Sequence, residues 1–355
     1  MDSNTPLESK IIELEERIKV ANLPIPLAEK LNEEISVFRL SLRGDPSAGS
    51  GLFMNFENFS NYVNRILSLP FNKETKDILD IAKAKEILDK NHYGLPSVKN
   101  VILEYLSSLI LNINNQNNIA HAPIICLTGL VGTGKTTLAY SIAESLGRKF
   151  ERIPLGGMGD ASDLRGKSRA SLDAEPGLVI KSLIHAQSRN AVILLDELDR
   201  ITDTGRKDIM GVLVELLDPE QNKSFVDHYI GYPFDMSKVL FIATGNNTTN
   251  IATAVLDRLQ IIQMPSYTDE EKTVIAQRYL FPGILKQTGL LGTQLIIDPA
   301  VWPTIIRPLG FDSGIRSLER AIEGVCRKAA RMIVEGKTQT VNVTSENVKE
   351  FLPAV

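Results

Sequence analysis

The stretch "CLTGLVGTGKTTLAYSIAESLG", residues 126–147, runs from an apolar segment through a glycine-rich turn into an amphipathic pattern. Its central part has the spacing G-x-x-x-x-G-K-[ST]. Glycines let successive backbone N–H groups point at one anion, and the following helix adds its N-terminal dipole. Lys135 would supply a point charge for the β- and γ-phosphates, and Thr136 a hydroxyl for Mg²⁺. The stretch therefore predicts a nucleotide-phosphate site formed by Gly129, Leu130, Val131, Gly132, Thr133, Gly134, Lys135, Thr136 and Thr137.

A second apolar strand, "AVILLDELD" at 191–199, ends in two carboxylates. Asp196 would hold Mg²⁺ through water, and Glu197 would polarise the water that attacks the γ-phosphate. Acids often cap strands at a solvated edge, so the pattern is weak by itself. It gains strength because it lies about 60 residues after the glycine-rich turn. Parallel strands deliver their carboxyl ends to one crevice.

A third apolar strand, "VLFIATGNN" at 239–247, ends in polar residues. Asn246 at its end would orient the attacking water. By its residues alone, this stretch is only a strand followed by a turn.

The composition fits an ordinary globular protein. The chain has 355 residues, 43% hydrophobic and 23% charged, which suits two or three domains. A net charge of −4 gives no electrostatic reason to expect a nucleic-acid partner. The two cysteines are too few for a disulfide framework or a zinc site, which favours a reducing compartment. With no apolar run of membrane-spanning length and no recognisable leader, the expectation is a soluble cytoplasmic protein without membrane association.

Helical patterns surround an alternating central region. Residues 7–42 indicate a helix broken once by "LPIP" at 23–26, and more helical patterns follow at about 55–69, 75–89 and 95–112. The two halves of the broken helix over 7–42 form either a hairpin packed on its own domain or an arm for self-association. Residues 124–265 alternate apolar runs with helical patterns, which predicts an α/β fold with a mostly parallel sheet and flanking helices.

A new unit begins near Thr268, which has Glu271 as its capping-box partner. Helical patterns at about 269–288, 314–336 and 345–352 and a short strand "QTVNVT" complete it. The expected domains are a helical arm over 1–42, a helical subdomain and linker over 43–122, a large α/β domain over 123–266 and a small helical domain over 267–355.

Taken together, these segments resemble the ATPase portion of the Lon proteases, which belong to the AAA+ superfamily of P-loop NTPases. The resemblance covers about residues 7–353. Its most specific segments are "HYGL" (92–95), "LGRKFERIPLGG" (146–157), "LLDPEQNKSFVDHY" (216–229), "KVLFIATGNN" (238–247), "VLDR" (255–258), "YTDEEK" (267–272) and "GIRSLERAIEGVCRKA" (314–329). It implies an AAA+ fold with a helical N-terminal region and a small, mainly helical lid, and it implies ATP and Mg²⁺ as cofactors.

The resemblance also assigns roles residue by residue. The matching positions are Glu197 for the catalytic Walker B glutamate, Asn246 for sensor 1, Arg258 for the arginine finger that reaches a neighbouring subunit, Arg316 for sensor 2, and His92, Tyr93 and Tyr267 for the adenine pocket. Simpler interpretations remain open: Arg258 as a solvated helix end, and Arg316 as an ion-pair partner of a nearby glutamate. An arginine finger requires a ring, so the resemblance implies a homo-oligomer, most simply a hexamer.

Three departures from the family pattern shape the functional expectation. No Ser-Lys peptidase domain follows in this sequence, and most of the family's N-terminal substrate-binding domain is missing. In "RGKSRASLDAEPG", 165–177, the aromatic-aliphatic pair that grips substrate is replaced by Ser171 and Leu172. Serine offers little contact area to an extended peptide, whereas a tyrosine ring offers much. The family's "PPG" is Leu130-Val131-Gly132 here.

The main hypothesis is an ATP-hydrolysing ring that remodels or chaperones a protein client without cleaving it. One alternative is a nucleotide-gated assembly or scaffold module, which the altered substrate segment favours. Another is the ATPase subunit of a two-component protease. A DNA-handling clamp-loader-like ATPase shares the architecture, but the acidic balance counts against it.

Overall fold

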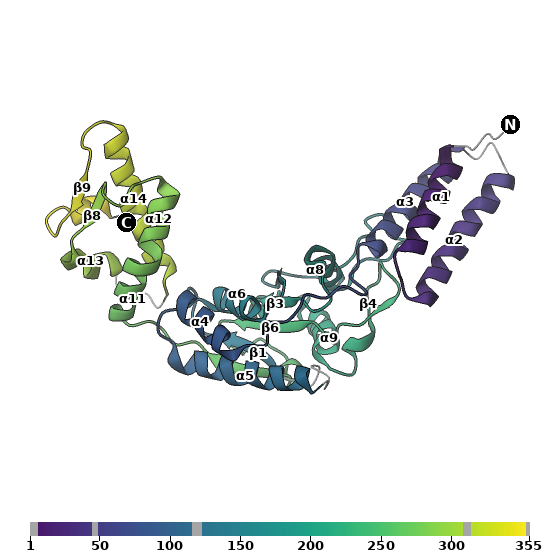
Figure 1. The fold of residues 1–355 in the computed structure, drawn as a ribbon, viewed down its shortest axis with the longest axis horizontal. Coiled ribbons are helices and arrows are strands. Elements are labelled where there is room, and N and C mark those ends of the chain that lie inside the picture. Colours follow the sequence, from purple (N-terminus) through teal and green to yellow (C-terminus); the bar gives the residue numbers. More distant parts are fainter. Residues whose placement is uncertain (1–5, 45–48, 116–122, 308–313, 353–355) are drawn as a thin grey trace.

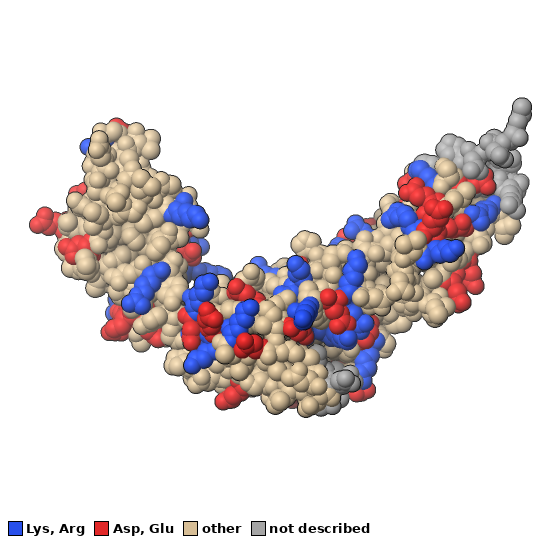
Figure 2. Space-filling view, viewed as in Figure 1, with Lys and Arg blue, Asp and Glu red and all other residues tan. Residues whose placement is uncertain are grey.

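The computed structural model describes residues 6–44, 49–115, 123–307 and 314–352. These form an arch in which a central α/β body carries three N-terminal helices at one end and a small helical unit at the other (Figure 1). Within the described ranges, no helix is long and apolar enough to cross a membrane. On the face drawn in Figure 2, acidic and basic side chains are interspersed over the central body.

The centre is a five-stranded sheet in the order β2-β3-β6-β1-β7. Its strands are all parallel: β1 (Ile124–Thr128), β2 (Phe150–Pro154), β3 (Val192–Asp196), β6 (Leu240–Gly245) and β7 (Leu259–Gln263). The predicted α/β class with a parallel sheet is confirmed. The sequence analysis did not single out β2, because "FERIP" at this sheet edge mixes apolar and charged residues.

Helices cover both faces of the sheet (Figure 1). Ile125 and Leu127 pack on one face with α4 (Ile81–Asn91), α5 (Pro96–Asn114) and α6 (Lys135–Leu146). Cys126, between them in sequence, points to the opposite face, which is covered by α8 (Leu178–Ala186) and α9 (Arg206–Leu217). This alternation follows from the two-residue period of a strand. The remaining short elements of the body are α7 (Ser162–Arg165), η2 (Leu198–Arg200), η3 (Asn222–Ser224), β4 (Phe225–Val226), β5 (Pro233–Phe234) and α10 (Thr253–Leu256).

The N-terminal helices are α1 (Pro6–Val20), α2 (Ile25–Gly44) and α3 (Gly49–Leu67). The predicted break between the first two is confirmed, because the chain leaves the helix at residues 21–24. Their buried stripes join the core on the α8–α9 side of the sheet. A bond of 2.8 Å from the Tyr62 hydroxyl to the Ile230 carbonyl anchors α3 to the body. The helical pair therefore packs on the rest of its own chain.

The C-terminal unit has a core of its own. It contains α11 (Asp269–Ile275), a π-helical segment (Ala276–Leu280), α12 (Phe281–Thr288), β8 (Leu295–Ile297), η5 (Pro299–Val301), α13 (Trp302–Ile306), α14 (Arg316–Val334), β9 (Val341–Val343) and α15 (Val348–Phe351). The capping box at Thr268 and Glu271 is confirmed. Strands β8 and β9 pair in parallel. Neither β8 nor α13 was expected, because each is too short to show a period.

Candidate functional site

The glycine-rich turn lies between β1 and α6, as its spacing requires. Three of its glycines have positive φ: 145° at Gly129, 82° at Gly132 and 89° at Gly134. A Cβ at Gly129 would lie 2.7 Å from the Met264 carbonyl oxygen, so a side chain is excluded there. Glycine is needed in this turn for both backbone conformation and close approach.

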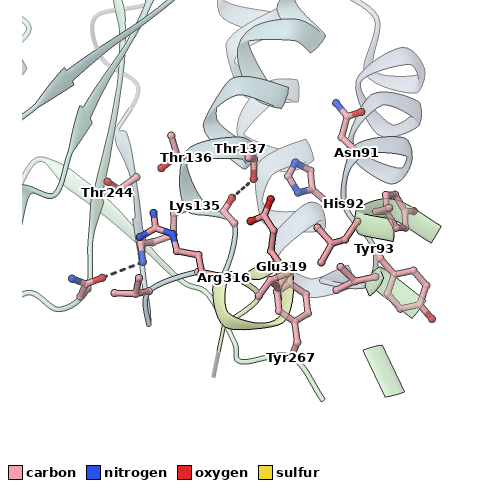
Figure 3. Close-up of a pocket in the computed structure, with 18 of the residues that line it drawn as sticks. Asn91, His92, Tyr93, Lys135, Thr136, Thr137, Thr244, Tyr267, Arg316 and Glu319 are labelled. Atoms are coloured by element: carbon pink, nitrogen blue, oxygen red, sulfur yellow. Dashed lines mark hydrogen bonds between the residues drawn. The ribbon is translucent and has the colours of Figure 1, made fainter. Parts of the chain in front are cut away.

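Lys135, the first residue of α6, folds back over this turn. Its Nζ donates to the carbonyl oxygens of Gly129 at 2.6 Å and Leu130 at 2.9 Å, and to Asn246 Oδ1 at 3.3 Å (Figure 3). Burial lowers the pKa of this amine, while nearby Asp199 and Asp196 oppose the shift. The sheet thus brings Asn246, at the end of β6, beside the lysine of the turn.

The end of β3 presents the two predicted carboxylates differently. Asp196 is buried; its Oδ1 accepts a hydrogen bond from the Thr244 hydroxyl, and its Oδ2 lies 2.6 Å from the guanidinium of Arg152. Glu197 has a left-handed backbone (φ 59°), and its N–H donates to Thr244 Oγ1 at 3.1 Å. Its carboxylate is half-buried and 3.4 Å from Arg200. The Thr244 hydroxyl therefore ties both acidic residues to β6.

On the other side of α6, aromatic and imidazole groups are held uncharged. His92 Nε2 lies 3.0 Å from the Ser141 hydroxyl, and burial lowers the pKa of His92 to about 4. The Tyr267 hydroxyl donates to the Thr133 carbonyl at 3.3 Å, and burial raises its pKa to about 12. Tyr93 lies beside His92 (Figure 3). This side of the site is chemically suited to a flat, neutral ring.

The C-terminal unit closes the site from above the glycine-rich turn. The Ile315 N–H donates to the Gly132 carbonyl at 3.1 Å, and Arg316 opens α14. Figure 3 shows the Arg316 side chain extending toward Lys135. The ion pair with a glutamate considered from the sequence does not form among the described residues: Glu323 pairs with Arg327 instead. Arg316 and Glu319 both line the cavity described next.

These groups surround one cavity of about 360 Å³. Of the predicted residues, it is lined by His92, Tyr93, Val131, Gly132, Gly134, Lys135, Thr136, Thr137, Glu197, Asn246, Tyr267 and Arg316. Gly129, Leu130, Thr133 and Asp196 adjoin it without lining it. Lining residues that the sequence analysis missed are Asn91, Thr244, Gly245, Ile275, Tyr279, Leu280, Ile315 and Glu319. Thr244 and Gly245 belong to the strand already singled out, whereas the helical residues carry no sequence signal of their own.

Arg258 is not brought to this cavity. Its guanidinium donates to Asp218 Oδ2 at 2.7 Å and to the Ala254 carbonyl at 2.6 Å. The contact with Arg258 holds the pKa of Asp218 below its usual range. Within one chain, Arg258 therefore has partners of its own and no contact with the predicted phosphate site.

The residues fit a magnesium ion that is shared with a nucleotide. No cluster of three or more His, Cys, Asp or Glu side chains suited to a metal occurs in the part of the chain that the structure describes. Magnesium commonly takes one or two protein groups plus substrate phosphates and waters. Thr136 and Thr244 line the cavity, and Asp196 adjoins it and accepts the Thr244 hydroxyl. This donor set suits that coordination and not an all-protein site.

The segment over 165–177 lies away from the cavity. Ser171 and Leu172 are exposed at its tip, and the Leu172 side chain is fully so. At its base, Asp227 accepts the Gly177 N–H at 2.8 Å. Arg169 lies 3.8 Å from the Tyr62 ring centre and pairs with Glu34, which joins the segment to α2 and α3.

Two family models match the chain. One, described as ATPase family associated with various cellular activities (AAA), matches residues 125–267. The other, described as Lon protease AAA+ ATPase lid domain, matches residues 286–341. The first contains the glycine-rich turn and the ends of β3 and β6; the second contains Arg316.

Curated relatives match almost the whole chain. The Lon protease of Lawsonia intracellularis (strain PHE/MN1-00) is 42% identical over 345 residues, which are 97% of this chain and 40% of that protein. The Lon protease of Clostridioides difficile (strain 630) is 41% identical over 347 residues, 98% of this chain and 42% of that protein. The Lon protease of Desulforamulus reducens (strain ATCC BAA-1160 / DSM 100696 / MI-1) is 45% identical over 292 residues, which are 82% of this chain and 35% of that protein. The chain thus spans about two fifths of the length of the first two relatives.

Proposed function

Because the chain belongs to the AAA ATPases and corresponds to the ATPase portion of the Lon proteases, we propose that it hydrolyses ATP as a homo-oligomer and remodels a protein client without cleaving it. The observation that carries the proposal is a cavity bounded by the glycine-rich turn, the ends of β3 and β6, and the start of α14. Its polar groups converge where a triphosphate would lie, and its aromatic groups lie at the adenine end.

In this proposal, the turn binds the phosphates through backbone N–H groups, and Lys135 exchanges its carbonyl partners for phosphate oxygens. That exchange is favourable because a charged acceptor makes the stronger hydrogen bond. His92, Tyr93 and Tyr267 hold the adenine. Thr136, and Asp196 through water, would hold Mg²⁺. The bound ion would neutralise phosphate charge.

Hydrolysis then depends on residues at the strand ends. Glu197 accepts a proton from the attacking water, and Asn246 orients that water. Arg316 contacts the γ-phosphate from the lid, which lets nucleotide state alter the angle between lid and body. Arg258 completes the site of the neighbouring subunit. We therefore propose a ring or spiral, most simply of six subunits.

The proposals of a client and of no cleavage rest on the segment over 165–177 and on the part of the relatives that the chain covers. The relatives are Lon proteases, and this chain covers about two fifths of their length, which corresponds to the ATPase portion. Leu172 remains as an exposed apolar contact for a client at the tip of 165–177, although Ser171 offers little area. This loss of grip favours a nucleotide-gated scaffold as the second candidate function.

The test is ATP turnover by the full chain, with and without an unfolded client protein. Glu197→Gln should keep ATP binding and lower kcat by about 100-fold or more, because a positioned general base typically contributes that much. Client-stimulated hydrolysis with an intact client favours remodelling. Hydrolysis indifferent to any client favours the scaffold, and wild-type protein that binds no ATP would refute both. If the client is cleaved and the cleavage persists in every ATP-site variant, a contaminating protease is responsible.

A further inference from the structure

We propose that Arg152 is a positioning residue that occupies the Asp196 carboxylate when the nucleotide carries no metal and releases it when Mg²⁺ arrives. The inference rests on the proposed function, since it concerns the same site. Arg152 lies on β2 and is not among the residues that line the cavity. Nothing in the sequence analysis assigned it a role.

The geometry comes from the pairing of two neighbouring strands. Pro154 of β2 pairs with Asp196 of β3 in the parallel register. Arg152 is two residues earlier, on the same face of β2, and its side chain extends along the sheet. Both Nε and Nη2 reach the same oxygen, Asp196 Oδ2, at 2.6 Å. The guanidinium therefore holds one carboxylate oxygen with a charge-assisted hydrogen bond from Nε and an ion-pair contact from Nη2.

The bonds to Asp196 leave it little capacity for another partner. An ionised carboxylate has about four acceptor positions. Arg152 covers Oδ2 with one hydrogen bond and a second close contact, and the Thr244 hydroxyl takes one position on Oδ1. A metal-bound water that donates to Oδ2 therefore competes directly with Arg152. The divalent charge also repels the guanidinium at this short range.

Exposure decides which partner moves. The Asp196 side chain is 6% exposed and the Arg152 side chain is 51% exposed. The carboxylate cannot turn to solvent without leaving its buried position, whereas the guanidinium can swing into water and keep its hydration. Because only Arg152 has this second environment, the exchange requires no rearrangement of β3.

The strand end that carries Arg152 also touches the catalytic carboxylate. The Leu155 N–H donates to the Asp196 carbonyl at 2.8 Å. A Cβ at Gly156 would lie 2.4 Å from Glu197 Oε2. The chain then continues into the segment over 165–177.

The experiment measures the dissociation constant of a fluorescent ADP in Mg²⁺ and in EDTA, at constant ionic strength, for the full chain. In Arg152→Gln, the EDTA-to-Mg²⁺ ratio of these constants should rise about tenfold, which is the usual scale of one charged hydrogen bond. An uncompensated Asp196 repels metal-free ADP and binds Mg²⁺ more tightly. Lys149→Gln, which removes an exposed charge just before β2, should keep the wild-type ratio.

Two further variants separate positioning from a general structural effect. Asp196→Asn should abolish the effect of Arg152→Gln in a double-mutant cycle. Arg152→Lys, which keeps the charge but not the fork, should give a smaller rise, and it carries the test if the glutamine variant does not fold. A ratio unchanged or lowered in Arg152 variants overturns the inference while leaving ATP binding intact. Wild-type protein that binds ADP in neither condition overturns the proposed function as well.

Discussion

At the scale of single residues, burial keeps His92 uncharged at the proposed adenine end of the cavity. His92 loses solvent and faces Lys99, and both effects lower its pKa, to about 4. Lys99 itself is fixed by Asp89 at 2.8 Å and by the His92 carbonyl. The imidazole is therefore neutral over the whole range in which a free histidine titrates. Nucleotide affinity should then not depend on histidine protonation between pH 5.5 and 8.

The same shift makes a prediction about stability. The pKa of His92 is about 4 when folded and near 6.5 when unfolded. Its contribution to stability is therefore fully present above about pH 6.5 and is lost as the pH falls toward 4. The total is on the order of 3 kcal/mol. His92→Gln can still bond to Ser141 but cannot titrate. Urea unfolding at pH 7 and pH 4.5 should show a smaller loss in the variant; equal losses would contradict the assignment.

The sequence was sufficient to predict which residues reach the cavity where their position depends on local spacing. Lys135 and Thr136 follow from one motif, and Glu197 follows from the strand before it. The contacts of Arg152 and Thr244 with Asp196 could not be predicted, because they depend on which strands become neighbours. The same holds for Arg258, whose partner Asp218 is 40 positions away in the chain.

At the scale of elements, helices and strands with long hydrophobic patterns could be predicted from the sequence, and short ones could not. The long helices and the apolar strands β1, β3, β6 and β7 were expected. Strand β2 was missed because it lies at the sheet edge, where Glu151 and Arg152 interrupt the apolar run. The helix expected over 269–288 is real but contains a π-helical segment at Ala276–Leu280. The expected domain limits remain a proposal: α3, placed with the second unit, packs with α1 and α2.

The segment over 165–177 has a rigid base and a free tip. Asp227 is fully buried and accepts the N–H groups of Gly177, Tyr229 and Ile230. Asp227→Ala should lower the free energy of unfolding by about 3 kcal/mol or more, because it leaves buried donors unpaired. Leu172→Ala, at the exposed tip, should change it by less than about 0.5 kcal/mol. Chemical denaturation measures both, and a tip variant as damaging as the base variant would be contrary to this arrangement.

The C-terminal unit, here called the lid, contacts the glycine-rich turn at Gly314, where there is no room for a side chain. A Cβ at Gly314 would lie 2.3 Å from the Val131 carbonyl oxygen. Gly314→Ala should push the start of α14, and Arg316 with it, away from the cavity. Overpacking of this kind costs about 1–3 kcal/mol, so ADP binding should weaken about tenfold or more. The control is Gly283→Ala in α12, where a Cβ meets open space. Titration with fluorescent ADP measures the affinity of both variants. If Gly314→Ala binds ADP as tightly as the wild type, the contact between Gly314 and Val131 does not contribute to nucleotide binding.

At the scale of the whole molecule, the cavity lies where the body meets the lid, and it depends on two separate cores. Lid movement can therefore change the cavity without disturbing the sheet. Arg258, in contrast, lies outside the cavity of its own chain and is held by Asp218. A cation fixed in this way can serve a reaction only where another surface is brought to it. This placement supports the proposal that neighbouring subunits share each site.

Mixing two inactive variants tests that sharing. Glu197→Gln should inactivate the site of its own subunit but still offer Arg258, whereas Arg258→Ala should keep its own site and offer nothing. In mixed oligomers, an Arg258→Ala subunit beside a Glu197→Gln neighbour has a complete site. Random mixing at equal amounts should therefore restore about a quarter of the wild-type ATP turnover. The double variant Glu197→Gln/Arg258→Ala, mixed in the same way with Arg258→Ala, should restore none. If native mass measurement shows mixed oligomers with no recovered turnover, Arg258 does not act across the interface.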